Sequence, residues 1–245
     1  MRLAFVAALV LGVLSTAVQA ECVDPSTLVH STVSITRYFD DGEQKTGSHG
    51  IRGTAWFLSP TSMVTAEHVA AAMRLSDQEW RQVKILEGEN KPSVAVRILR
   101  TAGSSAERLS VLELRGAYAG AQALQIRMDS VAAEERVVSL AYPRNRLRFA
   151  AGRFVRYGDS DRVAGTALLE MYDGDDRLVL DHGASGAPIL DCQGRVIAVV
   201  SNVFTQTVQT PFRAIRVSTA WGQPNVVSVP IQVLLMATET GSIRR

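Results

Sequence analysis

Short runs of apolar and β-branched residues, many of them alternating with polar residues, recur along most of the chain. They comprise residues 28–38, 54–58, 83–86, 94–100, 110–114, 137–142, 153–157, 167–172, 195–203 and 212–218. Alternation with a period of two is typical of strands that bury one face. Turn-forming clusters such as Asp40-Asp41-Gly42 and Gln193-Gly194 separate the runs, as they do in β-hairpins. The pattern predicts an all-β protein, built as a barrel or a sandwich.

Helical patterns are confined to short stretches of the chain. Residues 66–74 are rich in alanine, and an apolar stretch extends from residue 231 to about residue 237. We expect one short helix in each of these places. Residues 130–135 are polar enough to connect two halves of the chain, and no internal repeat is present. The absence of a repeat excludes a solenoid.

The N-terminal segment has the pattern of a secretory signal peptide. Arg2 precedes an apolar run over residues 3–13, and a segment of mostly small residues follows and ends at Ala20. A membrane anchor is the alternative, but it needs roughly 20 predominantly apolar residues. We therefore expect cleavage after Ala20 and an exported protein, either periplasmic or secreted, with no membrane attachment once the signal peptide is removed.

The charge balance gives no indication of a nucleic acid or an anionic membrane as a partner. The chain of 245 residues has a formal net charge of +2, and removal of residues 1–20 takes away only Arg2 and leaves +1. The remaining length suffices for one large all-β unit or two small domains. We expect a monomer.

Two cysteines are present, Cys22 and Cys192. In an exported protein they can form a lasting disulfide. Two free thiols are the alternative, and the sequence leaves both possibilities open.

Two segments carry candidate chemistry. The first, residues 53–69, predicts two strands followed by Thr65-Ala66-Glu67-His68 at the start of a helix. The second places Ser185 in a glycine-rich turn before an apolar strand, in the motif Gly183-Ala184-Ser185-Gly186-Ala187-Pro188. Either motif alone could be an ordinary turn or a buried histidine. An α/β-hydrolase motif is excluded because Ala187 stands where its second glycine would fall.

Together the two motifs resemble the chymotrypsin-like (trypsin-like) serine protease family, in which Thr-Ala-x-His precedes Gly-x-Ser-Gly-x-Pro. Leu140-Ala141-Tyr142-Pro143 and residues 194–201 also resemble bacterial, exported members, and the resemblance spans roughly residues 30–235. It implies two six-stranded antiparallel β-barrels and a short C-terminal helix. The implied domains are a signal peptide over 1–20, an N-terminal barrel over 21–129 with His68, and a C-terminal barrel over 130–245 with Ser185.

The resemblance also implies a mechanism. A serine hydroxyl needs a base to take its proton as it attacks a peptide carbonyl, and these roles fall on Ser185 and His68. The backbone N–H groups of Gly183 and Ser185 would bind the oxyanion of the tetrahedral intermediate. The implied function is that of an exported serine endopeptidase that acts on polypeptides through an acyl-enzyme. We expect no cofactor and no metal, because the remaining histidines have no second ligand at zinc spacing.

The sequence departs from the family at the third member of the catalytic triad. The strand that usually begins with aspartate reads Arg108-Leu109-Ser110-Val111-Leu112, and arginine has no acceptor to orient a histidine. Glu107 stands one residue earlier and would need a bulge or turn to reach His68, because neighbouring strand residues face opposite sides. Three outcomes stay open. Glu107 completes the triad, a Ser-His dyad remains, or the chain is a catalytically impaired pseudoprotease that binds peptides or proteins.

Substrate preference is also implied only by the resemblance. Val179 would lie near the base of the pocket for the residue before the scissile bond, and Ser201-Asn202-Val203 would form the strand that pairs with the substrate. An apolar base favours an aliphatic or aromatic side chain over lysine or arginine. An ordinary core position for Val179 is the alternative.

Overall fold

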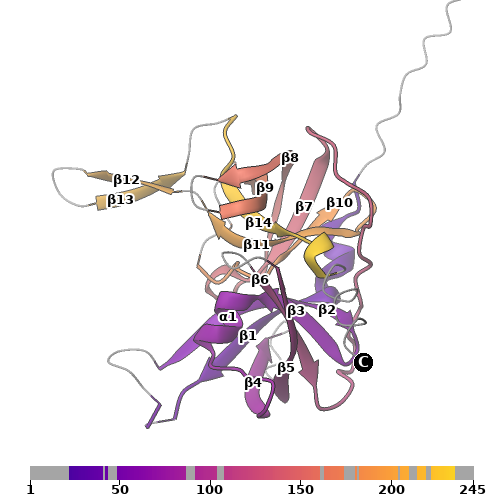
Figure 1. The fold of residues 1–245 in the computed structure, drawn as a ribbon, viewed down its shortest axis with the longest axis vertical. Coiled ribbons are helices and arrows are strands. Elements are labelled where there is room, and N and C mark those ends of the chain that lie inside the picture. Colours follow the sequence, from indigo (N-terminus) through magenta and orange to yellow (C-terminus); the bar gives the residue numbers. More distant parts are fainter. Residues whose placement is uncertain are drawn as a thin grey trace, which may run out of the picture.

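The first half of the chain forms a closed antiparallel barrel. Its strands lie in the order β1-β2-β3-β6-β5-β4, and Figure 1 shows them around one axis. Their bounds are β1 (Thr32–Tyr38), β2 (Gly50–Ser59), β3 (Ser62–Ala66), β4 (Arg81–Leu86), β5 (Ser93–Gly103) and β6 (Arg108–Leu114). A short α-helix, α1 (Glu67–Ala72), directly follows β3.

The second half forms another closed barrel, in the order β10-β11-β14-β9-β8-β7. Its strands are β7 (Arg136–Ala141), β8 (Arg148–Ser160), β9 (Val163–Tyr172), β10 (Pro188–Asp191), β11 (Val196–Val203) and β14 (Val226–Pro230). A separate hairpin of β12 (Thr205–Gln209) and β13 (Ala214–Ser218) projects from this barrel in Figure 1. The predicted architecture of two six-stranded antiparallel barrels is confirmed.

The computed structural model describes residues 22–40, 42–43, 49–86, 92–103, 108–160, 163–173, 180, 182–203, 205–209, 214–218 and 222–234. The expected signal peptide therefore lies outside the described residues. Of the expected C-terminal helix, residues 232–234 are helical and the remainder falls outside that range. Within the described part of the chain, no helix has the length and apolar character needed to cross a membrane.

The strand predicted over residues 28–38 begins later than expected. Residues Pro25–Ser31 form a 3-10 helix, and β1 begins only at Thr32. Asp24 caps this helix by accepting from the N–H of Ser26 at 2.9 Å, and the fixed φ of Pro25 suits a first helical position. This local capping outweighs the β-branched composition of the segment.

The alternation pattern also missed or shortened several strands. β14 was not predicted, although Val226, Val227 and Val229 give it an apolar run. β12 was missed because it is largely polar. β8 extends well beyond the predicted residues 153–157 because its first half contains Ala150, Ala151 and Gly152, which have weak strand propensity.

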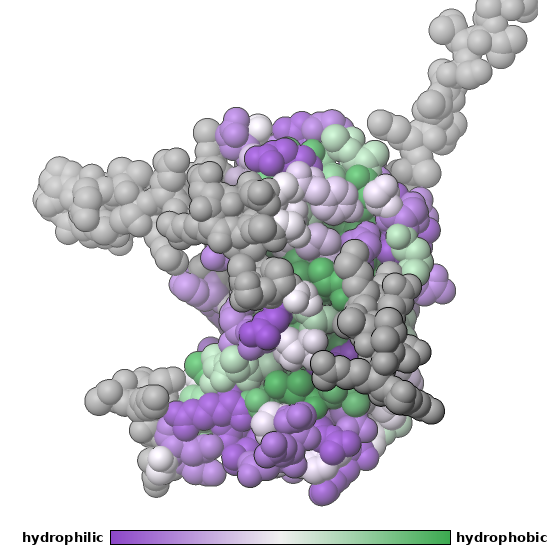
Figure 2. All heavy atoms as spheres, viewed as in Figure 1, coloured by the Kyte–Doolittle hydropathy of each residue, from purple (hydrophilic) through white to green (hydrophobic). Residues whose placement is uncertain are grey.

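Three clusters of buried apolar residues form the core. One fills each barrel, and the third joins the barrels, since it contains Trp56 and Leu109 from the first and Leu140 and Val199 from the second. Figure 2 shows apolar residues gathered on the side of the first barrel that faces the second, whereas hydrophilic residues cover its outer end. Burial of the apolar cluster that the barrels share stabilises the packing of one barrel on the other.

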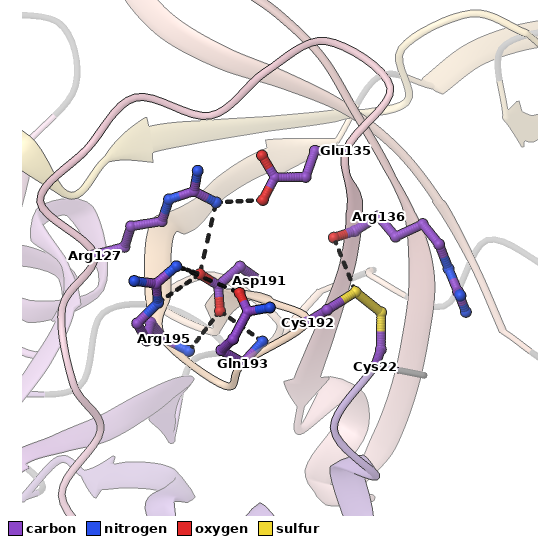
Figure 3. The surroundings of a disulfide bond; sticks show 8 residues. All are labelled: Cys22, Arg127, Glu135, Arg136, Asp191, Cys192, Gln193 and Arg195. Carbon is purple, nitrogen blue, oxygen red and sulfur yellow. Dashed lines mark hydrogen bonds and ion pairs between the residues drawn. A yellow bond between two sulfur atoms is a disulfide. The ribbon is translucent and has the colours of Figure 1, made fainter. Parts of the chain in front are cut away.

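A disulfide ties the N-terminal arm to the second barrel. Cys22 is bonded to Cys192, which lies 170 residues later, in the turn between β10 and β11 (Figure 3). The N–H of Val23 also donates to the carbonyl of Cys192 at 3.0 Å. Of the two possibilities that the sequence left open, the structure contains the disulfide.

A buried carboxylate next to this disulfide organises the same turn (Figure 3). Asp191 is fully buried and accepts the backbone N–H groups of Gln193 and Arg195, each at 2.9 Å. Its Oδ2 also accepts from Nε of Arg195 at 2.8 Å and lies 3.6 Å from Nη1 of Arg127, which in turn pairs with Glu135. Because a buried charge needs such partners, Asp191 holds the connection between the barrels against this turn.

A second buried carboxylate fixes the segment that leads into β14. Glu170 on β9 accepts Nε and Nη2 of Arg153 at 2.9 and 2.7 Å, and the N–H of Gly222 at 2.6 Å. Asn225 binds both the N–H and the carbonyl of Met171 through its side-chain amide. Burial raises the pKa of Glu170, but the hydrogen bonds from Gly222 and Arg153 outweigh it and hold this pKa below its ordinary value.

Loss of the disulfide should lower thermal stability. A cross-link between residues 170 positions apart restricts the unfolded chain. In the chain-entropy model this raises the free energy of the unfolded state by up to about 5 kcal/mol. We expect a Cys22→Ser, Cys192→Ser variant to unfold on the order of 10 °C below the wild type, as measured by circular dichroism. Reductant should lower the Tm of the wild type but not of the variant. Equal Tm values with and without reductant would contradict a stabilising disulfide.

Replacement of Glu170 should give a pH-dependent loss of stability. A depressed pKa in the folded state means that the carboxylate stabilises the fold above its unfolded pKa of about 4.3, and that this stability is lost as the pH falls through the folded-state value. We expect Glu170→Gln to lower the free energy of unfolding by about 1–3 kcal/mol at pH 7 and by progressively less below pH ~4. Urea titrations at several pH values measure this difference. Glu113→Gln, which removes a more exposed ion pair with Arg97, is the matched control and should cost under about 1 kcal/mol.

Candidate active site

Ser185 lies in a tight turn just before β10, and two glycines shape that turn. Gly183 and Gly186 have φ values of +98° and +93°, which favour glycine. A Cβ atom on Gly186 would lie 2.0 Å from the carbonyl oxygen of Thr54 and 2.3 Å from Oγ1 of Thr65. Any larger residue would therefore push the turn away from the first barrel.

The carbonyl groups of residues 182–185 each have a donor. The carbonyl of His182 accepts from the N–H of Arg144 at 3.3 Å, and that of Ala184 accepts from the N–H of Ala187 at 2.9 Å. The carbonyls of Gly183 and Ser185 accept from Oγ1 and the N–H of Thr54, at 2.7 and 2.9 Å. A trans peptide holds its N–H opposite its C=O. The orientations of the peptides that carry the N–H groups of Gly183 and Ser185 are therefore defined.

Two N–H groups of the Ser185 turn have no acceptor among the residues that the structure describes. Within the described part of the chain, neither the N–H of Gly183 nor that of Ser185 donates to another residue. Buried backbone N–H groups without a partner are uncommon in folded proteins, and both residues are partly buried. A pair of them next to a serine can bind a negatively charged oxygen.

The Ser185 hydroxyl donates to the carbonyl of Ser201 at 3.1 Å. Its one proton is therefore directed toward Ser201 in this structure. The ladder between β11 and β14 shifts register between Val200 and Asn202, so Ser201 stands at a β-bulge. Bulges often re-aim a group beside an active site. Of the predicted substrate-pairing residues, Ser201 contacts Ser185, Asn202 is exposed, and Val203 ends β11.

His68 is the second residue of α1 and is exposed. The preceding strand β3 is fastened to Thr54, because Oγ1 of Thr65 donates to the carbonyl of Thr54 at 2.7 Å. Thr54 also bonds to the Ser185 turn. Thr54 therefore contacts both the strand that leads into His68 and the turn that carries Ser185. This contact lies at the junction of the barrels, where Figure 1 shows α1.

The ladder between β3 and β6 ends just before the histidine segment. Leu109 pairs with Ala66, the last residue of β3, and Arg108 pairs with Gly103 on β5. Arg108 is exposed, and Glu107 and Val179 lie outside the described residues. No group of three or more metal-binding side chains occurs among the residues that the structure describes.

Sequence reasoning did not single out Thr54, although it lies within the motif that ends at His68. Its only signal was a hydroxyl in a strand of otherwise apolar residues, between Gly53 and Ala55. The Arg144 N–H and the side chain of Asn145, which accepts from the Ser34 hydroxyl at 2.9 Å, had no sequence signal.

Known proteins agree with this architecture. A family model described as a trypsin-like peptidase domain matches residues 53–199, more than half of the chain. The active form of the Rv3671c protease from M. tuberculosis is similar, with a TM-score of 0.57 and 18% identity over 89% of this chain and 83% of that chain. Deg5 is similar with a TM-score of 0.58 and 14% identity, over 86% of this chain and 88% of that chain. The HtrA-type protease AlgW with a decapeptide is similar with a TM-score of 0.58 and 12% identity, over 88% of this chain and 65% of that chain.

At these identities the solved structures show the fold alone, and no curated protein matches the sequence significantly. The family model is the stronger finding, because its matched range contains both His68 and Ser185 on the two barrels that the structure brings together. On that ground the chain belongs to the trypsin-like peptidase family.

Proposed function

We propose that this serine protease is an exported endopeptidase in which Ser185 is the nucleophile and His68 the general base. The observation that carries the proposal is the Ser185 turn. Its carbonyl groups are held by donors, while the N–H groups of Gly183 and Ser185 have no acceptor within the described residues. Such a turn is suited to bind the oxyanion that forms when a serine attacks a peptide carbonyl.

The proposed mechanism requires the Ser185 hydroxyl to change its hydrogen-bond partner. The Ser185 hydroxyl leaves the carbonyl of Ser201 and donates to His68, which takes its proton as Oγ bonds to the substrate carbonyl carbon. The resulting oxyanion accepts from the N–H groups of Gly183 and Ser185, each of which contributes about 3–4 kcal/mol. His68 then protonates the leaving amine, and water hydrolyses the acyl-enzyme by the reverse sequence.

The substrate is proposed to be a polypeptide that pairs with β11 along Ser201, Asn202 and Val203. Val179 would contact the side chain before the scissile bond and favour an aliphatic or aromatic residue. Removal of residues 1–20 would release the protein, as a monomer, into the periplasm or the medium. The proposed division into barrel domains over 21–129 and 130–245 assigns one catalytic residue to each.

The proposed nucleophile can be tested with a fluorophosphonate probe, which reacts with activated serines. We expect folded wild-type protein to be labelled and Ser185→Ala to be unlabelled, because the probe requires an activated serine beside oxyanion donors and Ser185 is the proposed one. Ser59→Ala, a change at the end of β2, is the control and should be labelled like the wild type. A folded wild type that binds peptides without being labelled would instead indicate a pseudoprotease.

The proposed triad acid, Glu107, can be tested by a pH profile of acylation. A carboxylate that orients His68 should make Glu107→Gln slower by as much as about 10⁴-fold near neutral pH. Arg108→Gln is the neighbouring control and should change the rate little, because arginine cannot orient the imidazole. If both variants follow the wild-type profile, Glu107 has no catalytic role and the protein works with a Ser-His dyad.

A further inference from the structure

Thr54 links the first barrel to the nucleophile turn through more than one bond. It is fully buried on β2. Its N–H donates to the carbonyl of Ser185 at 2.9 Å, and its Oγ1 donates to the carbonyl of Gly183 at 2.7 Å. The same Oγ1 accepts the N–H of Tyr142 at 3.0 Å. One residue of the first barrel therefore contacts two segments of the second.

The Thr54 hydroxyl fixes the peptide that follows Gly183. A glycine at φ +98° has no Cβ to limit its rotation, so this peptide could turn over without a steric penalty. The hydrogen bond from Thr54 to the Gly183 carbonyl holds it in one orientation. With the Ser185 carbonyl also held by the Thr54 N–H, the N–H of Ser185 lies between two constrained peptides.

The same hydroxyl also holds the segment that supports Gly183 from the other side. Tyr142 donates to Thr54, and two residues later the N–H of Arg144 donates to the carbonyl of His182. Arg144 and Asn145 have φ values of +53° and +61°, a left-handed conformation that costs non-glycine residues of order 1 kcal/mol each. The surrounding hydrogen bonds must maintain this strained segment, and the bond to Thr54 is one of them.

We propose that Thr54 is a positioning residue for the oxyanion site, and that its hydroxyl keeps the N–H groups of Gly183 and Ser185 aimed at the reacting carbonyl. This inference rests on the proposed function, since it assigns a role at the same site. Only a side chain that both donates and accepts can bridge the Gly183 carbonyl and the Tyr142 N–H, so serine should replace threonine here and valine should not.

The test compares Thr54→Val, which keeps the shape and loses the hydroxyl, with Thr54→Ser, which keeps the hydroxyl. Thr166→Val is the matched control, because Thr166 is also fully buried and its Oγ1 donates to a carbonyl, that of Gly158, at 2.7 Å. Acylation by a chromogenic peptide ester would be followed under single-turnover conditions. Circular dichroism would confirm that each variant is folded at the assay temperature.

We expect Thr54→Val to acylate about 10- to 100-fold more slowly, somewhat less than the loss of a whole oxyanion donor, with little change in substrate affinity. Thr54→Ser should stay within about threefold of the wild type, and Thr166→Val should match it. The proposal is overturned if Thr54→Val reacts like Thr166→Val, or if Thr54→Ser is as slow as Thr54→Val.

A second measurement separates this inference from the proposed function. If the wild type itself fails to acylate, the proposed function is wrong, but the positioning role can still be measured by NMR. Thr54→Val should then speed amide exchange at Tyr142 at least about tenfold, since its acceptor is lost, and should shift the carbonyl carbon of Gly183. Unchanged exchange and an unchanged shift would overturn the positioning role regardless of activity.

Discussion

The candidate site depends on the contact that Thr54 makes across the junction of the barrels. Each barrel has its own buried apolar core, and the strands of each pair into a closed barrel. The Ser185 turn depends on both barrels, because two of its carbonyls find their donors on β2 of the other barrel. The apolar cluster shared by the barrels brings β2 within reach, and the hydrogen bonds then define the turn. Docking of the barrels and formation of the site are therefore one event.

The same dependence explains the glycine at position 186. The turn approaches β2 so closely that a Cβ at this position would overlap the Thr54 carbonyl. That carbonyl already accepts from Thr65, on the strand that leads into α1. A methyl group there would have to displace both the Ser185 turn and the segment before His68. The Ser-Gly pair in the sequence thus reflects a close approach between barrels as well as the conformation of a turn.

Much of the fold could be predicted from the sequence because strand alternation and turn residues are local signals. The strand predicted over residues 28–31 was wrong, because the helix cap at Asp24 outweighs the β-branched composition there. Ser185 and His68 could be singled out because each stands in a short motif. Thr54 could not, since its acceptor on Gly183 lies 129 residues away and no local pattern reports such a partner. A sequence motif can therefore single out residues through their neighbours in the chain, whereas a contact between distant segments leaves no such signal.

Arg108 stands where the family usually has the triad aspartate, so the case for activity depends on the Ser185 turn. The ladder with β3 ends at Leu109, the residue after Arg108, and Arg108 is exposed, so water and salt screen its charge. An arginine has no acceptor to orient a histidine. A missing or displaced acid would slow the base, yet it would leave the oxyanion donors intact, and these alone retain much catalytic power over water. Preservation of the turn is therefore the feature that distinguishes a slow protease from a scaffold that has lost the reaction.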